Sequence, residues 1–398
     1  MSATQRHLSR PFQDFVGSES AGAILLIIGT VTSLLIANSS YGPGYLRLWQ
    51  VQVSGLSVAL WVNDALMAIF FLLIGLELER ELYRGELSDG RNALLPIIAA
   101  IGGMVVPALI HFSLNSGTPE VRGMGIPTAT DIAFALGIIA ILGNRIPASL
   151  KVFVVAFAVI DDLSAIVIIA VFYTAQLGTG YLAAALAVWT LLLVLNRLFR
   201  VMSLIPYLLG GVLMWFLMLK SGVHPTVAGV LLAFAIPFST AKGDEESPSQ
   251  RLEHLLHRPV ALIILPIFAL ANTGIVVGAD WIQQLTNANS IGIAAGLIVG
   301  KPLGVTVLCV VAVATGICRL PPGVNWRHVI GAGLLGGVGF TMSTFIANLA
   351  FAGKPEVVDS SKLAILLASL ISGTIGFLWL AALAGPRRRP GRFDPPDH

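Results

Sequence analysis

Long apolar runs separated by short polar segments make up most of this chain. Each run is about 20 residues long, which is the length that an α-helix needs to cross the hydrocarbon core of a bilayer. The pattern therefore predicts an all-α membrane protein. Hydrophobic windows predict twelve transmembrane helices, at residues 21–38, 57–77, 93–113, 122–142, 150–174, 181–196, 204–219, 222–238, 259–277, 290–312, 328–350 and 363–385.

Composition supports the same class. The 398 residues are 56% hydrophobic and 11% charged, whereas soluble domains carry about 25% charged residues. We expect one transmembrane domain over residues 1–398, with short cytoplasmic tails at residues 1–19 and 386–398. The net charge of +3 does not indicate nucleic-acid binding, because the basic residues lie at the ends of the apolar runs, where membrane topology explains them.

The distribution of Lys and Arg predicts the orientation. With the N-terminus inside, 18 of these residues fall in inner segments, five fall in outer segments, and Lys301 belongs to neither group. Because cytoplasmic loops are enriched in Lys and Arg, both termini are predicted to be cytoplasmic. The outer segment 45–53 is flanked by glycines. It is interpreted either as a small hairpin whose free edge can pair with a second copy or as an ordinary loop.

Parts of the sequence repeat. Ile98 and Pro107 in the third span recur as Ile293 and Pro302 in the tenth, at the same offset. Spans that are seven apart cross the membrane in opposite directions. Spans 3–5 and 10–12 are therefore predicted to form an inverted repeat, an architecture common among transporters.

The fourth and eleventh spans contain helix-breaking residues. The fourth holds Gly123-Met-Gly-Ile-Pro-Thr-Ala-Thr-Asp131, and the eleventh holds Gly336-Gly-Val-Gly-Phe-Thr-Met-Ser343. Glycine and proline disfavour an unbroken helix, and irregular backbone at membrane depth must be buried in protein or line a wet cavity. We expect two interrupted helices that meet, with kinked but continuous helices as the alternative.

Two adjacent aspartates, Asp161 and Asp162, lie inside the fifth span. A charge in hydrocarbon costs several kcal/mol, so residues of this kind indicate function. Neighbours on a helix point about 100° apart, so one aspartate can pair with Lys301 while the other faces a cavity. Dehydrated carboxylates bind both protons and small hard cations such as Na⁺ or Li⁺. Competition between the two at one site, with access alternating between the sides, is sufficient for antiport.

Asp131 and Lys301 are candidates for charge compensation. Asp131 follows Thr130 at the expected interruption, and Lys301 lies deep in the tenth span beside a ridge of glycines at 292, 296, 300 and 304. Half-helix ends carry roughly half a unit of charge each, which an aspartate and a lysine would neutralise. Direct ligation of the cation remains the alternative for Asp131.

These residues lie in motifs that resemble a known family. Phe157-Ala-Val-Ile-Asp-Asp-Leu-Ser-Ala165, Pro127-Thr-Ala-Thr-Asp-Ile-Ala-Phe-Ala135, Gly300-Lys-Pro-Leu-Gly304, Gly339-Phe-Thr-Met-Ser343 and Lys220-Ser-Gly-Val-His224 closely resemble the NhaA-type bacterial Na⁺/H⁺ antiporters, which are themselves inverted-repeat transporters. The similarity runs from about residue 10 to residue 385.

The resemblance implies roles for individual residues. Asp162 would be the principal carboxylate for cation and proton, and Asp161 would be its partner, paired with Lys301 in one state. Thr130 and Asp131 would mark the crossing of the interrupted helices, with Thr130 near the cation. Asp64 would lie toward the outer side.

The resemblance also implies a mechanism and an assembly. It predicts a pH-activated, electrogenic exchanger of the bacterial inner membrane that carries Na⁺, Li⁺ and H⁺. It further predicts a homodimer in the lipid bilayer, with no enzymatic activity and no cofactor.

Candidate pH-sensing residues gather at the predicted cytoplasmic ends of the second and ninth spans. Glu253 and His257 are four residues apart on one helical face, which favours coupled titration. A merely solvated charged face is the alternative for this cluster. His224, beside Pro225, is interpreted either as a pH modulator or as a loop residue. The cluster comprises Glu77, Glu81, Glu253, His254 and His257.

Three other classes of protein explain the sequence less well. An intramembrane aspartyl protease needs its aspartates on separate helices, and the Gly-Asp dipeptide of this chain, Gly243-Asp244, lies in a polar loop. A cation channel does not need a lysine that neutralises its carboxylates. A cation-coupled solute symporter of related fold is the main alternative function, although it requires a larger polar cavity.

Overall fold

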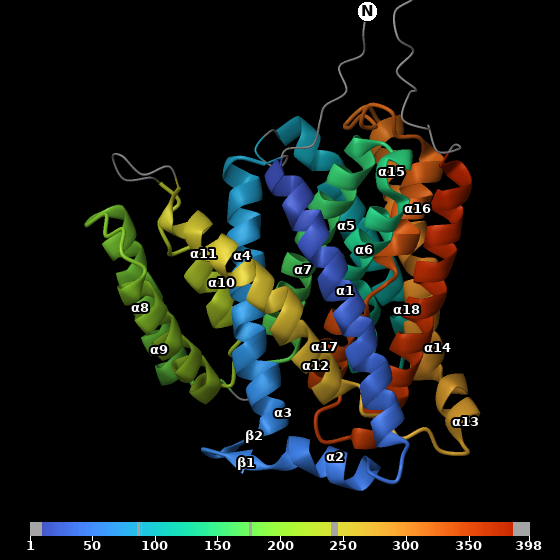
Figure 1. The fold of residues 1–398 in the computed structure, drawn as a ribbon, viewed down its shortest axis with the longest axis horizontal. Coiled ribbons are helices and arrows are strands. Elements are labelled where there is room, and N and C mark those ends of the chain that lie inside the picture. The colour runs from blue at the N-terminus through green and yellow to red at the C-terminus, as the bar shows by residue number, and fades with distance from the viewer. Residues whose placement is uncertain (1–9, 86–87, 89, 175–176, 240–245, 385–398) are drawn as a thin grey trace, which may run out of the picture.

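The computed structural model describes residues 10–85, 88, 90–174, 177–239 and 246–384, and within these ranges the chain is a bundle of helices (Figure 1). One end of the bundle carries α2 and a small β-hairpin, and we call it the hairpin end. The opposite end carries the start of α1 and the end of α18 (Figure 1).

The first half of the chain, to residue 172, contains α1 (Arg10–Ala37), α2 (Gly42–Gln50), β1 (Gln52–Val53), β2 (Leu56–Ser57), α3 (Val58–Leu60), η1 (Trp61–Leu66), α4 (Met67–Tyr83), α5 (Gly90–Asn115), η3 (Pro119–Thr128), α6 (Ile132–Leu142), η4 (Gly143–Arg145) and α7 (Ala148–Phe172). The second half contains α8 (Thr179–Arg197), α9 (Ile205–Ser221), α10 (Val227–Ala233), α11 (Pro248–Pro259), η5 (Val260–Ile264), α12 (Leu265–Asn272), α13 (Trp281–Thr286), α14 (Ala288–Ala295), η6 (Gly296–Gly300), α15 (Lys301–Ala314), α16 (Trp326–Gly336), α17 (Phe340–Ala350) and α18 (Pro355–Leu383). The segments η1, η5 and η6 are π-helical, and η3 and η4 are 3₁₀-helical.

The helices identify a multi-pass membrane protein. Among the described residues, eight are long and apolar enough to cross a bilayer, or up to ten if two bent pairs each count as one span. The count of twelve spans stays a prediction. The predicted span at 222–238 contains a regular helix only over the seven residues of α10, because Pro225 and Pro237 interrupt the helical hydrogen bonding on either side.

The first predicted span agrees with the structure, and the outer segment after it differs in part. The part of α1 that is apolar enough to cross a membrane is Ala21–Ala37, close to the predicted 21–38, and the helix extends back to Arg10, so residues 10–19 of the predicted tail are helical. The rest of the two predicted tails lies outside the described residues. In the outer segment, residues 42–50 form helix α2, which has a proline in its first turn, where proline is tolerated. The hairpin forms only after it, pairing β1 with β2 through Ser54 and Gly55, which both have positive φ angles.

Both predicted helix interruptions are present. The fourth span is a 3₁₀-helix, η3, followed by an extended segment at 129–131 and then by α6. In the eleventh span, α16 and α17 are separated by three residues and bent by 46°. Most residues of η3, α6, α16 and α17 are buried, so the irregular backbone lies within protein, where membrane depth permits it.

The glycines at 292, 296, 300 and 304 allow close helix packing. A Cβ atom placed on Gly304 would lie 2.0 Å from the carbonyl oxygen of Gly102, and one on Gly102 would lie 2.2 Å from that of Gly304. Helix α5 therefore packs backbone to backbone against α15, which begins with Lys301. The inverted repeat that contains these two helices stays a prediction.

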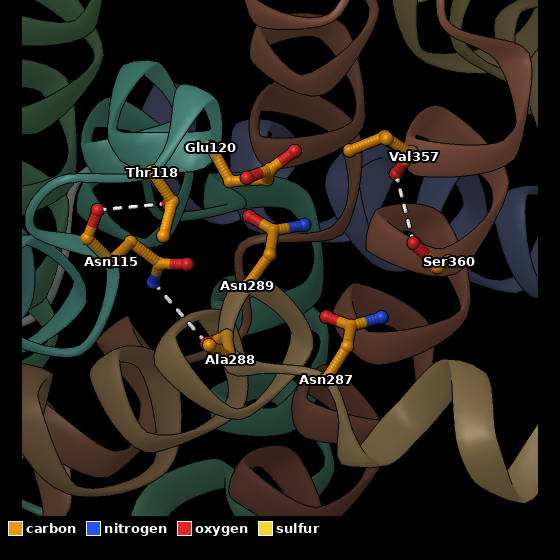
Figure 2. Close-up of a pocket in the computed structure, with 8 residues that line it drawn as sticks. All are labelled: Asn115, Thr118, Glu120, Asn287, Ala288, Asn289, Val357 and Ser360. Atoms are coloured by element: carbon orange, nitrogen blue, oxygen red, sulfur yellow. Dashed lines mark hydrogen bonds between the residues drawn. The ribbon is translucent and has the colours of Figure 1, made fainter.

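A polar pocket opens at the hairpin end, where the last turn of α5 and the beginnings of η3, α14 and α18 come together (Figure 2). It shares no residue with the aspartate pair on α7.

Candidate functional site

The two interrupted helices cross in direct contact. The Asp131 amide donates to the carbonyl of Val338 at 2.6 Å. The Thr130 hydroxyl donates to the carbonyl of Gly336, the last residue of α16, at 2.8 Å. Backbone groups that the interruptions leave without helical partners are thus satisfied by the other interrupted helix.

Asp131 joins the beginnings of two half-helices. Its Oδ1 accepts from the Phe134 amide in the first turn of α6, at 3.4 Å. Its Oδ2 accepts from the amide of Thr341, at 3.2 Å, and from the Thr341 hydroxyl, at 2.7 Å, in the first turn of α17. Helix N-termini carry partial positive charge, so a carboxylate placed at both is electrostatically favourable.

Lys301 forms an ion pair with Asp161. Its Nζ lies 2.7 Å from Asp161 Oδ2, and neither side chain has exposed surface. The same ammonium group donates to the carbonyl of Thr128, the last residue of η3. Lys301 therefore sits where a half-helix C-terminus and a carboxylate both present negative charge.

A π-helical segment sets the position of this lysine. Lys301 directly follows η6 (Gly296–Gly300), and such single-turn π segments are frequent at functional sites. The glycines of η6 permit close approach, since a Cβ on Gly296 would meet Pro127 of η3 at 2.6 Å. The lysine also lies over the Phe157 ring, with its Nζ 5.6 Å from the ring centroid.

Asp162 lies beside this ion pair without an ion pair of its own among the described residues. The residue is 1% exposed. Its Oδ1, like Oδ1 of Asp161, is enclosed and has no hydrogen-bond partner within the described ranges. Buried polar oxygens without partners are costly and call for an explanation. Enclosed carboxylate oxygens of this kind suit a proton or a small hard cation.

Asp64 and His224 form a separate pair nearer the hairpin end. Asp64 lies in the π-helical segment η1, and its Oδ1 is 3.5 Å from His224 Nε2. The imidazole packs edge-on against Phe345 of α17, with the ring centroids 5.1 Å apart. His224 is therefore separate from the glutamate and histidine cluster at the other end, as its predicted place beside Pro225 implied.

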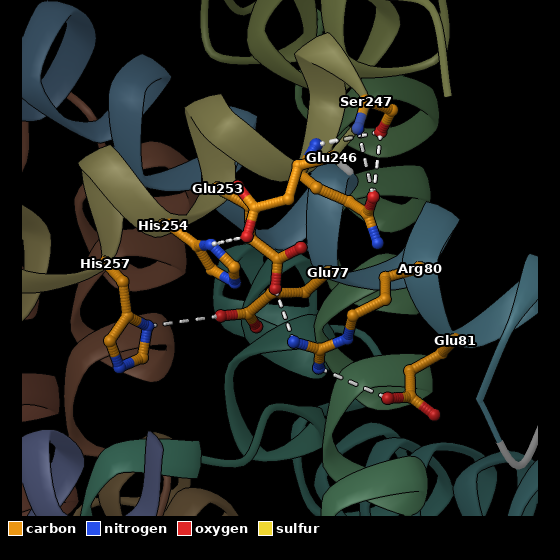
Figure 3. A network of polar contacts seen from close by, with 9 residues as sticks. Glu77, Arg80, Glu81, Glu246, Ser247, Glu253, His254 and His257 are labelled. Atoms are coloured by element: carbon orange, nitrogen blue, oxygen red, sulfur yellow. Dashed lines mark hydrogen bonds and ion pairs between the residues drawn. The ribbon is translucent and has the colours of Figure 1, made fainter. Parts of the chain in front are cut away.

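At the opposite end of the bundle, α4 and α11 bring together most of the predicted pH-sensing residues (Figure 3). Glu77 Oε1 lies 3.7 Å from His257 Nδ1. Arg80 forms ion pairs with Glu253 and, at 3.2 Å, with Glu81. Arg80 is thus the centre of the cluster, although sequence reasoning had counted it only as an inner basic residue.

His254 lies apart from that cluster. It faces Glu246 at 3.4 Å, and the two side chains are 59% and 46% exposed (Figure 3). The i to i+4 spacing of Glu253 and His257 placed both on one face, as expected, but each meets a different residue of α4.

Sequence reasoning missed a buried carboxylate contact next to this cluster. Glu79 is 4% exposed, and its Oε2 accepts from the Ser249 hydroxyl at 2.7 Å. No spacing rule links residues 79 and 249. The signal in the sequence was the middle acid of Glu77-Leu-Glu-Arg-Glu81, where glutamates occupy alternate positions.

Comparisons with known proteins agree with the geometry. The sequence model of the family described as Na⁺/H⁺ antiporter 1 matches residues 13–380. A protein of Dechloromonas aromatica (strain RCB), named Na(+)/H(+) antiporter NhaA, is 65% identical over 381 residues, covering 96% of this chain and 98% of the relative. Relatives with the same name are 56% identical over 373 residues in Cytophaga hutchinsonii, covering 94% and 95%, and 50% identical over 370 residues in Vibrio campbellii (strain ATCC BAA-1116), covering 92% and 94%.

Proposed function

Because the chain belongs to the Na⁺/H⁺ antiporter 1 family, we propose that it exchanges Na⁺ or Li⁺ for H⁺ at the buried Asp161–Asp162 pair. The observation that carries this proposal is the enclosed Asp162 Oδ1, which has no partner among the described residues and lies beside the Lys301–Asp161 ion pair. The cation is the transported substrate, and Asp162 is its principal ligand. Family membership does not favour the solute symporter.

Competition at the carboxylates couples the two ions. A proton on Asp162 neutralises the group that Na⁺ needs, so the two ions exclude each other. Lys301 holds Asp161 in the state that lacks Na⁺. If Na⁺ recruits both carboxylates, Lys301 loses its counter-ion, and a buried lysine without one favours release of its own proton. More than one proton then moves for each Na⁺, which makes the exchange electrogenic.

Alternating access uses the crossing of the interrupted helices. Asp131 and Lys301 offset the partial charges of the half-helix ends, so the crossing can be buried without unbalanced charge. Asp131 has a compensating role in this scheme, because both of its oxygens already accept hydrogen bonds from helix N-termini. The Thr130 hydroxyl donates to Gly336 and keeps a lone pair that is free to ligate the cation.

We infer that the hairpin end faces outward and both termini face the cytoplasm of a bacterial inner membrane, since 18 basic residues against five favour that orientation. The Arg80 cluster then lies on the cytoplasmic side, where it senses pH and activates exchange in alkali. The exposed hairpin edge supports a homodimer.

Reconstitution into proteoliposomes tests the exchange. Adding Na⁺ should collapse an imposed pH gradient in wild-type vesicles, and Asp162→Asn should abolish that response. Asp280→Asn, which changes an exposed carboxylate on a hairpin-end loop, serves as the matched control and should behave as wild type. Antiport is refuted if wild type moves no protons in response to Na⁺, or conducts Na⁺ alone. Electrogenicity fails if clamping the membrane potential leaves the rate unchanged.

A further inference from the structure

The polar pocket at the hairpin end has the features of a binding site. It has a volume of about 270 Å³, several times the roughly 30 Å³ that one water molecule occupies in the liquid. Its walls come from three separate stretches of the chain, at 115–120, 287–289 and 357–360. The lining residues are Asn115, Thr118, Glu120, Asn287, Ala288, Asn289, Val357 and Ser360 (Figure 2).

Asn115 presents an oxygen atom to this pocket. The residue is 1% exposed. Its Nδ2 donates to the carbonyls of His111, at 3.0 Å, and Ala288, at 3.2 Å. These two donations fix which side-chain atom is nitrogen. The remaining atom, Oδ1, accepts no hydrogen bond within the described ranges, and it points into the space between Asn115 and Asn289 (Figure 2).

A second buried amide is oriented in the same way. Asn289 is 3% exposed, and its Nδ2 donates to Ser361 Oγ at 2.8 Å. Its Oδ1 lies 3.0 Å from His111 Nε2 and turns toward Asn115 (Figure 2). A carbonyl oxygen has two lone pairs, so one stays available on the pocket side. The network behind the pocket thus holds two amide oxygens in place.

Glu120 supplies the charge. It is the one charged residue among the eight that line the pocket, and it is half-buried. Its carboxylate forms no ion pair or hydrogen bond with the other described residues, and it lies above the two amides (Figure 2). Such a carboxylate repels anions. A site whose ligand atoms are oxygens, with no nitrogen or sulfur ligand, binds hard cations in preference to transition metals.

The number of carboxylates in the pocket distinguishes a monovalent cation from Ca²⁺. Ca²⁺ takes six to eight oxygen ligands and is usually bound by several carboxylates. One carboxylate with neutral oxygens instead matches a monovalent cation that keeps part of its water shell. We propose that this pocket is a second cation site, separate from the aspartate pair, which binds Na⁺ or Li⁺ weakly from the hairpin side. The choice of Na⁺ and Li⁺ rests on the exchange proposed above.

Binding here would act on an interrupted helix. Glu120 belongs to η3, whereas Asn289 belongs to α14 and Ser360 to α18. A cation that binds all three residues would hold the beginning of η3 against α14 and α18. The other end of η3 is Thr128, whose carbonyl accepts from Lys301. The second site is therefore joined to the exchange site through one 3₁₀-helix of ten residues.

Binding of radioactive Na⁺ to purified full-length protein tests the proposal. Asp162→Asn removes the principal transport carboxylate, and this variant should keep weak, saturable Na⁺ binding. Adding Glu120→Gln to it should weaken that binding roughly tenfold or more, since contacts with a charged ligand contribute about 1.5–3 kcal/mol. Adding Asp280→Asn instead, which removes an exposed carboxylate at the same end, should leave it unchanged.

Two results would overturn the second site. One is an absence of saturable binding in Asp162→Asn, and the other is binding that Glu120→Gln leaves unchanged, which would place the residual Na⁺ at Asp161. Glu120→Gln is nearly isosteric at a half-buried position, and the thermal unfolding of each variant shows whether it is folded. The exchange proposal is tested independently, because it fails if Asp162→Asn vesicles still exchange Na⁺ for H⁺, whatever Glu120→Gln does to binding.

Discussion

Lys301 and Asp161 are joined by a 2.7 Å ion pair in which neither side chain has exposed surface. Breaking such a pair from one side leaves an uncompensated buried charge, which typically costs 3–5 kcal/mol. Each of the two residues is therefore needed for stability as long as the other stays charged, in addition to its part in the proposed exchange.

Because the two charges compensate each other, the loss of one should be offset by removal of the other. We expect Lys301→Ala to lower the free energy of unfolding by about 3–5 kcal/mol, and Asp161→Asn in the same chain to restore most of the loss, because both charges are then gone. Thermal unfolding in detergent measures both changes. Lys354→Ala, at an exposed lysine, should cost little. A loss below about 1 kcal/mol in Lys301→Ala, or no rescue by the second substitution, contradicts the prediction.

Asp131 is predicted to act by charge compensation. Asp131→Asn keeps an acceptor oxygen but removes the charge at the beginnings of α6 and α17, so stability should fall by about 1–2 kcal/mol. Na⁺ affinity, measured by direct binding to the purified variant, should change little. Unchanged stability together with lost Na⁺ binding would instead identify Asp131 as a cation ligand.

The closest helix contact gives a steric prediction. A Cβ on Gly304 would lie 2.0 Å from the Gly102 carbonyl oxygen, a backbone atom that cannot rotate away. Gly304→Ala should therefore destabilise the protein by about 1–3 kcal/mol or more and displace Lys301, one turn earlier on α15, with loss of exchange.

The matched control for that substitution is Gly44→Ala on α2, where a Cβ would meet nothing within 4 Å. It should be neutral or slightly stabilising, since alanine is the better helix former. Equal effects of the two substitutions on thermal unfolding would show that the packing of α5 against α15 is looser than the structure indicates.

Glu79 gives a pH-dependent prediction. This carboxylate is 4% exposed and accepts one hydrogen bond, from Ser249, with no ion pair among the described residues. Burial penalises its ionised form. Glu79→Gln should therefore raise stability in alkali by about 1 kcal/mol or more, and the gain should vanish in acid, where the wild-type carboxyl is protonated.

Glu253 is the matched comparison for Glu79. It is 3% exposed, on the facing helix α11, and it is paired with Arg80. Glu253→Gln should destabilise the protein in alkali because it leaves Arg80 with less compensation. Thermal unfolding across pH measures both variants, and the same sign of change in alkali would contradict this interpretation.

The sequence by itself determined the class of the protein and singled out the residues of the candidate site. Apolar runs of bilayer length made the chain a membrane protein. Glycine and proline within 123–131 and 336–343 predicted the two interruptions, because proline lacks the N–H that a helix needs and glycine loses more conformational entropy in a helix. The cost of burying charge singled out Asp161, Asp162, Asp131 and Lys301. Local rules failed at residues 42–57, where α2 forms over most of the segment predicted as a hairpin or loop and the hairpin follows it, and at 222–238, where flanking prolines shortened the helix.

The family resemblance implied the pairing of Lys301 with Asp161, but for the other buried pairs only the tertiary structure decided which groups meet. The pairs Lys301–Asp161, Asp131–Thr341, Arg80–Glu253 and Glu79–Ser249 join residues at least 140 positions apart. Helix periodicity fixes the face on which a side chain lies but not which helix packs against that face. The close approach of α15, which begins with Lys301, to α5 through Gly304 and Gly102 is of the same kind. That approach depends on packing among all the helices, and no window along the chain contains it.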